Sequence, residues 1–167
     1  GERMNTVKSL KNFKNGRSIA DTLNYMENLV KAGVDMFDVD LGCYDNWWLP
    51  HPPAGMPAGC FLDVSKVAKE YFAARGIKSN VGVEVPIVGK LGYPDIAEKA
   101  LRDGKADMIM LGRPVLADPD WCNKAYAGKV EEIRPCIGCQ EACVNEFVEG
   151  GHPQCAVNPR TGFEDVL

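Results

Sequence analysis

The feature that most constrains the fold is a repeated order of apolar strand, glycine-containing turn and amphipathic helix. Runs rich in apolar and β-branched residues predict buried strands at 34–41, 81–88 and 107–111. Segments with apolar residues at helical spacing predict helices that begin at Ser18, Asp63 and Pro94. Such alternation predicts a parallel sheet with helical crossovers, as in α/β barrels.

Each predicted helix has one apolar stripe that we expect to face the sheet. In the first, which ends at Gly33, the stripe is Ile19, Leu23, Met26 and Val30. In the second, which ends at Gly76, it is Val64, Val67, Ala68, Tyr71 and Phe72. In the third it is Ile96, Ala97, Ala100 and Leu101.

The number of strands limits what the chain can be. A closed (β/α)8 barrel needs eight strands and typically ~250 residues, whereas the pattern predicts three strands in 167 residues. We therefore expect the C-terminal portion, about three βα units, of a TIM (β/α)8 barrel. The predicted boundaries are a partial barrel domain at 1–134 and a cysteine-rich segment at 135–167.

Four of the seven cysteines gather near the end of the chain. Cys136, Cys139, Cys143 and Cys155 have the spacing C-x2-C-x3-C-x11-C, which is close to that of compact thiolate runs holding iron–sulfur clusters. A structural zinc is the alternative, but zinc is more often held by two separated pairs of ligands. A disulfide framework is less consistent with an odd number of cysteines and no signal peptide. A reducing, cytoplasmic setting fits best.

The amino-acid composition argues against nucleic acid and membrane as binding partners. The net charge is −4, and no basic face is concentrated after the first seventeen residues, which argues against nucleic acid. No apolar run approaches the roughly 20 residues needed to cross a bilayer, so we expect no membrane partner. The 46% of hydrophobic residues is ordinary for a protein with a packed core.

Two of the predicted strands are followed by a glycine and a cation. Gly89 and Lys90 follow the second, and Gly112 and Arg113 follow the third. A turn glycine beside a solvated cation is the simpler explanation for either pair alone. In barrels, however, the loops after the last two strands commonly bind phosphate, and two such pairs in succession favour a bound phosphate.

The loop between the first strand and the second helix is long and aromatic. It contains Tyr44, Trp47 and Trp48, as well as His51 between two prolines. Loops of this length are usually functional or disordered, and the aromatic content argues against disorder. The tryptophans could wall a hydrophobic pocket or pack beneath the loop.

Four sequence segments together resemble a known family. They are Val-Pro-Ile-Val-Gly-Lys (85–90), Gly-Lys-Ala-Asp-Met-Ile-Met-Leu-Gly-Arg-Pro-Val-Leu-Ala-Asp-Pro (104–119), Ile-Arg-Pro-Cys-Ile-Gly-Cys (133–139) and Cys-Ala-Val-Asn-Pro-Arg (155–160). This combination resembles the old yellow enzyme family of NADH:flavin oxidoreductases. Within it, the chain is most similar to the iron–sulfur branch of 2,4-dienoyl-CoA reductase and the bile-acid-inducible enoate reductases.

The resemblance implies FMN in the barrel, a [4Fe-4S] cluster on Cys136, Cys139, Cys143 and Cys155, and a further domain for FAD and NAD(P)H. It implies that electrons pass from NAD(P)H through FAD and the cluster to FMN, which reduces an activated C=C bond of an unsaturated carbonyl substrate. The FMN phosphate would be bound by Gly89, Lys90, Gly112 and Arg113. Tyr44 occupies the position of a proton-donating histidine, and His51 is a second candidate donor.

The resemblance also implies partners, namely the remainder of the barrel and a nicotinamide-binding domain, and it leaves a homo-oligomer open. The strand before Gly89 is slightly shorter than the family pattern, so Arg113 is the firmer expected phosphate ligand. A loop similar to those of bile-acid-inducible reductases suggests a steroid enone as substrate. The alternative function is a small iron–sulfur electron-transfer or metal-binding module without flavin chemistry.

Overall fold

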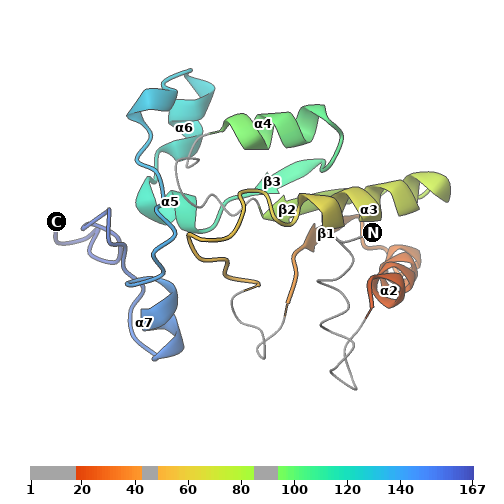
Figure 1. Cartoon of the computed structure of the whole chain (residues 1–167), viewed down its shortest axis with the longest axis horizontal. Helices are drawn as coiled ribbons and strands as arrows, with labels where there is room; N and C mark the ends of the chain where they lie inside the picture. The colour runs from red at the N-terminus through yellow and green to blue at the C-terminus, as the bar shows by residue number, and fades with distance from the viewer. Residues whose placement is uncertain (1–17, 43–48, 85–93) are drawn as a thin grey trace.

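A parallel β-sheet forms the centre of the structure, a computed structural model that describes residues 18–42, 49–84 and 94–167. The strands β1 (Met36–Val39), β2 (Asn80–Glu84) and β3 (Met108–Met110) lie in the order β1-β2-β3. Phe37 pairs with Val81, and Val83 pairs with Ile109, both in parallel register. The alternation of strands and helices confirms the predicted partial barrel (Figure 1).

Helix α2 (Ile19–Lys31) has the start and the end that the sequence predicted. The Asp21 backbone N–H donates to Ser18 Oγ at 3.1 Å, and the Ser18 N–H donates to Asp21 Oδ2 at 3.0 Å. This reciprocal capping box satisfies backbone N–H groups that would otherwise lack partners. Gly33 follows the helix with a φ of 102°, a conformation that glycine adopts without steric cost.

Helix α3 (Leu62–Ala74) differs from the prediction at its start. Asp63 was expected to be the N-cap, and this was wrong, because the helix begins at Leu62 after Phe61. Asp63 lies in the first turn, where its carboxylate still interacts favourably with the positive N-terminal end of the helix dipole. Val67 was expected to face inward but is 37% exposed, because the side of α3 that contacts β2 buries Ala68 and Phe72.

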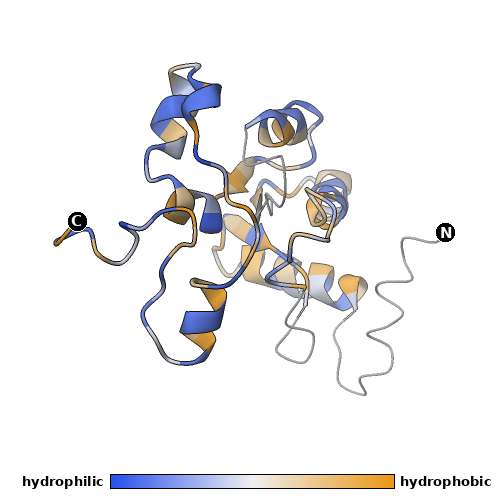
Figure 2. Cartoon of the chain, turned by 60° about the vertical axis from the view of Figure 1, so that its left-hand side comes forward, coloured by the Kyte–Doolittle hydropathy of each residue, from blue (hydrophilic) through white to orange (hydrophobic). Residues whose placement is uncertain are grey.

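Helix α4 (Asp95–Arg102) buries Ala97 and Ala100. Leu101, which was expected to face inward, is 40% exposed. The helix presents charged residues outward, and Figure 2 shows a hydrophilic outer side on α4. Apolar residues on the inner side are enough to attach such a short helix to β3.

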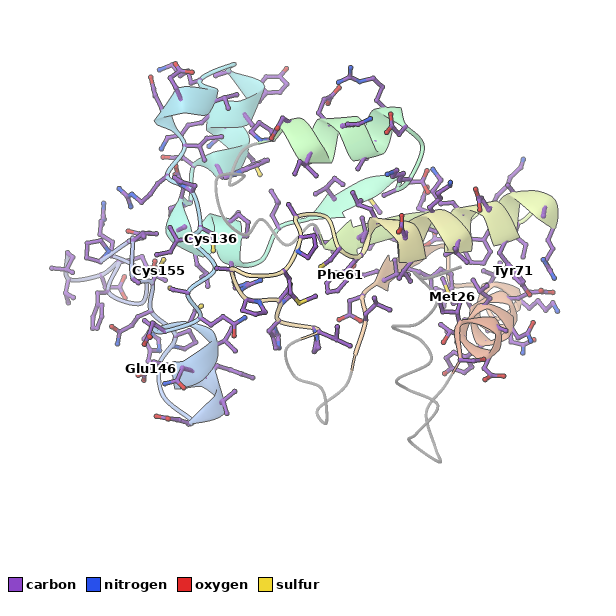
Figure 3. The ribbon with its side chains drawn as sticks, in the orientation of Figure 1. Met26, Phe61, Tyr71, Cys136, Glu146 and Cys155 are labelled. Carbon is purple, nitrogen blue, oxygen red and sulfur yellow. The ribbon has the colours of Figure 1, made fainter. Side chains whose placement is uncertain are left out.

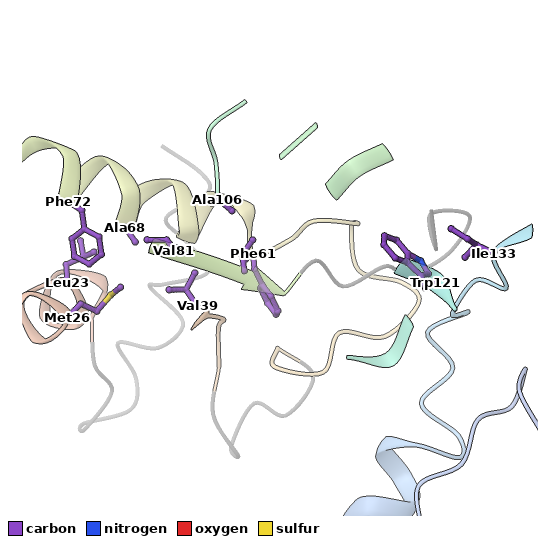
Figure 4. Packing of buried hydrophobic residues seen from close by; sticks show 11 residues of the cluster. Leu23, Met26, Val39, Phe61, Ala68, Phe72, Val81, Ala106, Trp121 and Ile133 are labelled. Atoms are coloured by element: carbon purple, nitrogen blue, oxygen red, sulfur yellow. The ribbon is translucent and has the colours of Figure 1, made fainter. Parts of the chain in front are cut away.

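The hydrophobic core lies between the sheet and the helices α2 and α3. Phe61, Phe72, Val81 and Val83 are almost fully buried, and the rings of Phe37 and Phe72 have centroids 5.7 Å apart. Figure 4 shows Leu23, Met26 and Phe72 gathered between α2 and α3, and Phe61 near the end of β2. This packing holds the first two βα units together and fixes where the loop before α3 ends.

Asp107, just before β3, ties the sheet to α3. Its carboxylate accepts a hydrogen bond from the Val81 N–H at 2.9 Å and forms an ion pair with Lys69 Nζ at 2.7 Å. Burial by itself would raise the pKa of Asp107, but these two partners outweigh burial and lower it.

After β3 the chain leaves the repeating pattern. The short helices are α5 (Arg113–Ala117), α6 (Trp121–Tyr126), the 3-10 helix η3 (Val130–Glu132) and α7 (Val144–Val148). In Figure 1 the chain runs out through α6, returns past α5 and continues into α7. The cysteine-rich segment is therefore placed beside the end of β3. Within the described part of the chain, no helix is long and apolar enough to span a membrane.

Candidate metal centre

Arg113 begins α5 directly after β3 and turns its guanidinium toward the loop that follows β1. Its Nη2 donates to the Pro52 carbonyl oxygen at 3.1 Å. Its Nη1 is buried and has no hydrogen-bond partner among residues 18–42, 49–84 and 94–167. A buried cationic donor without an acceptor is costly, so the position suits an anionic or sulfur-containing group beside it.

The four predicted cysteine ligands come together next to Arg113. The side chains of Cys136, Cys139, Cys143 and Cys155 line one pocket, and Arg113 lines it as well. Figure 3 shows Cys136 and Cys155 on the side of the molecule that carries α5, far from Met26 and Tyr71. The rest of the lining is mainly apolar: Leu116, Ile137, Ala142, Ala156 and Val157, together with Gln140.

The four thiols of the pocket can be compared with the ligand sets of two kinds of metal centre. The four thiols are free. Among the described residues, no three His, Cys, Asp or Glu side chains converge as the ligands of one metal ion do. A zinc ion would need four donors at about 2.3 Å from one point. In a four-iron cluster each thiolate binds a different iron, so the ligands surround a larger group. Thiols spread around a mainly apolar pocket fit that group.

The electrostatic surroundings of Cys136 oppose a free thiolate. Burial raises the pKa of the Cys136 thiol, and the nearby Cys143 and Cys155 raise it further. The Gly138 N–H, 3.4 Å from Cys136 Sγ, and the Arg113 guanidinium act in the opposite direction. Because the thiol is favoured without a cation, binding a cationic centre would release protons.

The chain before the cysteines is anchored to the C-terminal end of α5. The Arg134 N–H donates to Asp118 Oδ2 at 2.8 Å, and Arg134 Nη1 donates to the Ala117 carbonyl at 3.4 Å. Burial would raise the pKa of Asp118, but hydrogen bonds from Lys124 Nζ and the N–H groups of Arg134 and Asp120 lower it overall. The carboxylate is therefore charged at neutral pH and holds Arg134 in place.

The chain after the cysteines is anchored to the same helix. Asn158 Nδ2 and Thr161 Oγ1 both donate to the Leu116 carbonyl, at 2.9 Å and 2.7 Å. Asn158 and Thr161 are 4% and 5% exposed. Neither these two residues nor Asp118 were among the functional residues predicted from the sequence. Asp118 and Asn158 each precede a proline, a pattern that is typical of ordinary turns, and Thr161 carries no such signal.

His51 lies within the loop that meets this centre. Its carbonyl oxygen accepts a hydrogen bond from Gln140 Nε2 in the cysteine segment. Burial lowers the pKa of His51, and the Arg113 guanidinium lowers it further, while Asp40 acts in the opposite direction. The imidazole is therefore neutral at pH 7.

The structure thus brings His51, Arg113 and the four cysteines into one region. Gly112 is the N-cap of α5 at the end of β3. The other predicted site residues, Tyr44, Gly89 and Lys90, lie outside the described residues. His152 is hydrogen-bonded through Nε2 to the Gly162 carbonyl at 3.1 Å and does not line the pocket.

No family model matches the chain. It is 36% identical over 151 residues to cinnamate reductase of Clostridium sporogenes, covering 89% of this chain and 21% of that protein. It is 32% identical over 154 residues to NADH oxidase of Thermoanaerobacter brockii, covering 90% of this chain and 22% of that protein. Amine dehydrogenases are also among the similar proteins.

A solved structure of 2-naphthoyl-CoA reductase with 2-naphthoyl-CoA superimposes with a TM-score of 0.79 and 25% identity, covering 91% of this chain and 22% of that one. The chain thus spans about a fifth of the length of the relatives it matches. By sequence and by fold, it belongs to the old yellow enzyme-like family of flavin and iron–sulfur reductases.

Proposed function

We propose that the chain is part of a flavin-dependent oxidoreductase that reduces an activated C=C bond, as in an enoate, a dienoyl thioester or a steroid enone. Residues 1–134 would belong to the FMN-binding barrel, and residues 135–167 would bind a [4Fe-4S] cluster. The observation that carries this proposal is the pocket lined by Cys136, Cys139, Cys143 and Cys155 beside Arg113 at the end of β3. NAD(P)H and FAD would supply electrons in the complete enzyme.

Each group of residues has a definite part in this proposal. The four cysteines would hold the cluster, and the apolar Leu116, Ile137 and Val157 would keep water from it. When bound, the cluster supplies one-electron transfer and the flavin supplies hydride transfer. The anchors on α5 keep both flanks of the cysteine segment in register with the barrel.

Gly112 and Arg113, with Gly89 and Lys90 from the preceding loop, would bind the FMN phosphate. The buried, unpartnered Nη1 of Arg113 supports a role in holding an anion. The same guanidinium faces the cysteine pocket and holds the Pro52 carbonyl. Arg113 would therefore contribute positive charge between the phosphate, the cluster and the loop that contains His51 and Pro52.

Protonation of the substrate would fall to Tyr44 or His51. Because the pKa of His51 is lowered, its ring is neutral at pH 7 and would act through a neutral N–H rather than as an imidazolium acid. A neutral N–H is a weaker acid but can still orient and polarise a carbonyl by hydrogen bonding. A tyrosine hydroxyl is the other donor available at neutral pH.

The names of two similar proteins indicate a class of substrate. The names cinnamate reductase and 2-naphthoyl-CoA reductase describe reduction of conjugated acyl compounds. This favours a C=C bond conjugated to a carbonyl over the oxidation of an amine. The remaining parts of the barrel and the nicotinamide domain would be the partners of this chain.

The first test is the cluster itself. The purified chain, treated anaerobically with ferrous iron, sulfide and a thiol, is expected to develop broad visible absorption and to bind about four irons. Cys139→Ser is expected to lose most of this iron, because one corner of the cluster then lacks its thiolate. Iron analysis and electron paramagnetic resonance after reduction provide the measurement.

Cys122→Ser is the matched control, because Cys122 is an exposed free thiol that does not line the pocket. It should keep the iron of the parent chain. Unchanged iron content in Cys139→Ser would reject the ligand assignment. A cluster combined with no FMN binding in a fluorescence titration would favour the iron–sulfur carrier instead.

A further inference from the structure

Gln140 has an unusual backbone for its residue type. Its φ is 61°, and it is the only non-glycine residue with a positive φ among residues 18–42, 49–84 and 94–167. The left-handed region is uncommon for side chains other than Asn, Asp and Gly. Residues kept in this region are held there by surrounding contacts, and they cluster at functional sites.

The contacts of Gln140 explain what holds it. It follows Cys139 directly, and its carbonyl oxygen accepts the Asn145 N–H at 3.0 Å, which joins it to the start of α7. Its side-chain Nε2 donates to the His51 carbonyl, 89 positions away in the sequence. One residue thus joins the cysteine segment to the loop after β1.

The loop that receives this hydrogen bond contains three prolines close together. Pro50, Pro52 and Pro53 have no N–H groups, so the loop cannot be held by regular backbone pairing. Two successive carbonyls, those of His51 and Pro52, instead accept bonds from Gln140 and Arg113. The side chain of Pro52 is almost fully buried.

We propose that Gln140 is a positioning residue that fixes the His51 loop against the cysteine segment, so that ordering of the cysteines also orders the loop over the substrate side. This inference rests on the proposed function for the identity of the group that orders the cysteines. The contact between Gln140 and His51 itself does not depend on that identity. The cluster and the loop would therefore be coupled through one side-chain amide.

The design of the test follows from the backbone. Gln140→Gly removes the amide but favours the left-handed φ, so it should leave the folding of the cysteine loop intact. Gln140→Asn also tolerates this φ but is one methylene shorter and cannot reach the His51 carbonyl in the same way. Glu141→Gln, at an exposed neighbouring position, is the control.

The measurement is hydrogen exchange of the loop in the full chain, with and without iron and sulfide. The Met56 N–H, which donates to the Pro53 carbonyl at 3.0 Å, reports opening of the loop. In the parent chain, binding of iron and sulfide should slow the hydrogen exchange of the Met56 N–H. Gln140→Gly and Gln140→Asn should keep the iron but exchange about threefold to tenfold faster, as expected for one lost hydrogen bond.

A second measurement detects positioning of the ring. The chain has two histidines, so the NMR signals of His51 can be assigned and its pKa followed in the unloaded protein. In Gln140→Gly the pKa of His51 should rise toward its ordinary value, because the ring moves away from its buried place and from Arg113, while Asp40 still raises it.

The two proposals fail in different ways. A parent chain that takes up no iron would defeat the proposed function, yet the exchange and NMR comparison of Gln140→Gly with the parent would still decide the positioning role. If Gln140→Gly binds iron and shows parental exchange and an unchanged His51 pKa, the positioning role of Gln140 is rejected.

Discussion

Asp118 accepts hydrogen bonds from three directions at a position where its side chain is only 5% exposed. Lys124 Nζ lies 2.7 Å from Oδ2, the Arg134 N–H lies 2.8 Å from the same oxygen, and the Asp120 N–H lies 3.1 Å from Oδ1. A buried carboxylate is favourable only with such complete pairing. At the residue scale, this one side chain decides where the cysteine segment begins.

We expect Asp118→Asn to lower the free energy of unfolding at pH 7 by about 1–3 kcal/mol, since an amide cannot accept all three bonds and leaves donors unpaired. The folded-state pKa of Asp118 lies below its ordinary value of 3.8. Its contribution is therefore fully present above that ordinary value and is lost as pH falls through the lower folded value. Urea unfolding of the parent and of Asp118→Asn from pH 7 to pH 3 measures the free energy of unfolding of each. The difference between the two free energies should shrink only at the acidic end of this range.

The control for this change is Glu98→Gln on α4, whose exposed pair with Arg102 spans 3.8 Å. An exposed pair of this kind adds little stability, so the unfolding midpoint should stay unchanged. A stability difference between Asp118→Asn and the parent that remained constant down to pH 3 would contradict the assigned charge.

At the scale of elements, the cysteine segment is closed by a tight approach of two loops. Gly162 has a φ of 81°, and a Cβ at this position would lie 2.8 Å from the His152 ring and 2.9 Å from the Pro153 carbonyl. No larger side chain fits without displacing the loop that leads into Cys155. Helix α5 anchors this loop from the other side through Asn158 and Thr161.

We expect Gly162→Ala to destabilise the chain and to reduce the iron retained after loading. Alanine is strained at the positive φ of this position, and its Cβ would also clash with His152 and the Pro153 carbonyl. Gly104→Ala separates the two costs. Gly104 has a φ of 66°, but a Cβ added there would meet no atom within 4 Å, so this control carries only the conformational cost of about 1–2 kcal/mol. Equal unfolding midpoints and equal iron for the two variants would contradict the steric argument.

At the scale of the whole molecule, the described residues supply a three-stranded sheet, whereas a closed barrel of this family has eight strands. Met36 in β1 is 46% exposed. Phe147 and Val148 on α7 are 64% and 61% exposed. These apolar groups indicate surfaces that would be covered in a complete enzyme.

We expect the purified chain by itself not to oxidise NADH or NADPH with an enoate such as cinnamate, because the described residues hold neither a complete flavin site nor a nicotinamide site. Anaerobic spectrophotometry of the nicotinamide, with a complete cinnamate reductase as positive control, measures this. Turnover by the isolated chain would overturn the view that it is one part of a larger catalytic unit.

The sequence predicted the elements well because each is encoded by near neighbours. Helix α2 begins after Ser18 and ends before Gly33, as expected, since a cap and a left-handed turn depend on a few adjacent residues. The parallel sheet followed from the alternation of strands and helices. The start of α3 was placed wrongly at Asp63, because burial of Phe61 outweighed a favourable capping residue.

The fold class, the family and the set of cysteines worth testing could all be inferred from the sequence, because these depend on spacing and composition along the chain. The role of the cysteines as cluster ligands stays a prediction. The folded chain was needed to show that these cysteines line one pocket with Arg113, that α5 anchors both flanks, and that Gln140 reaches His51. Such contacts join side chains to carbonyls tens of residues apart, and their partners depend on how helices and loops pack rather than on any local pattern.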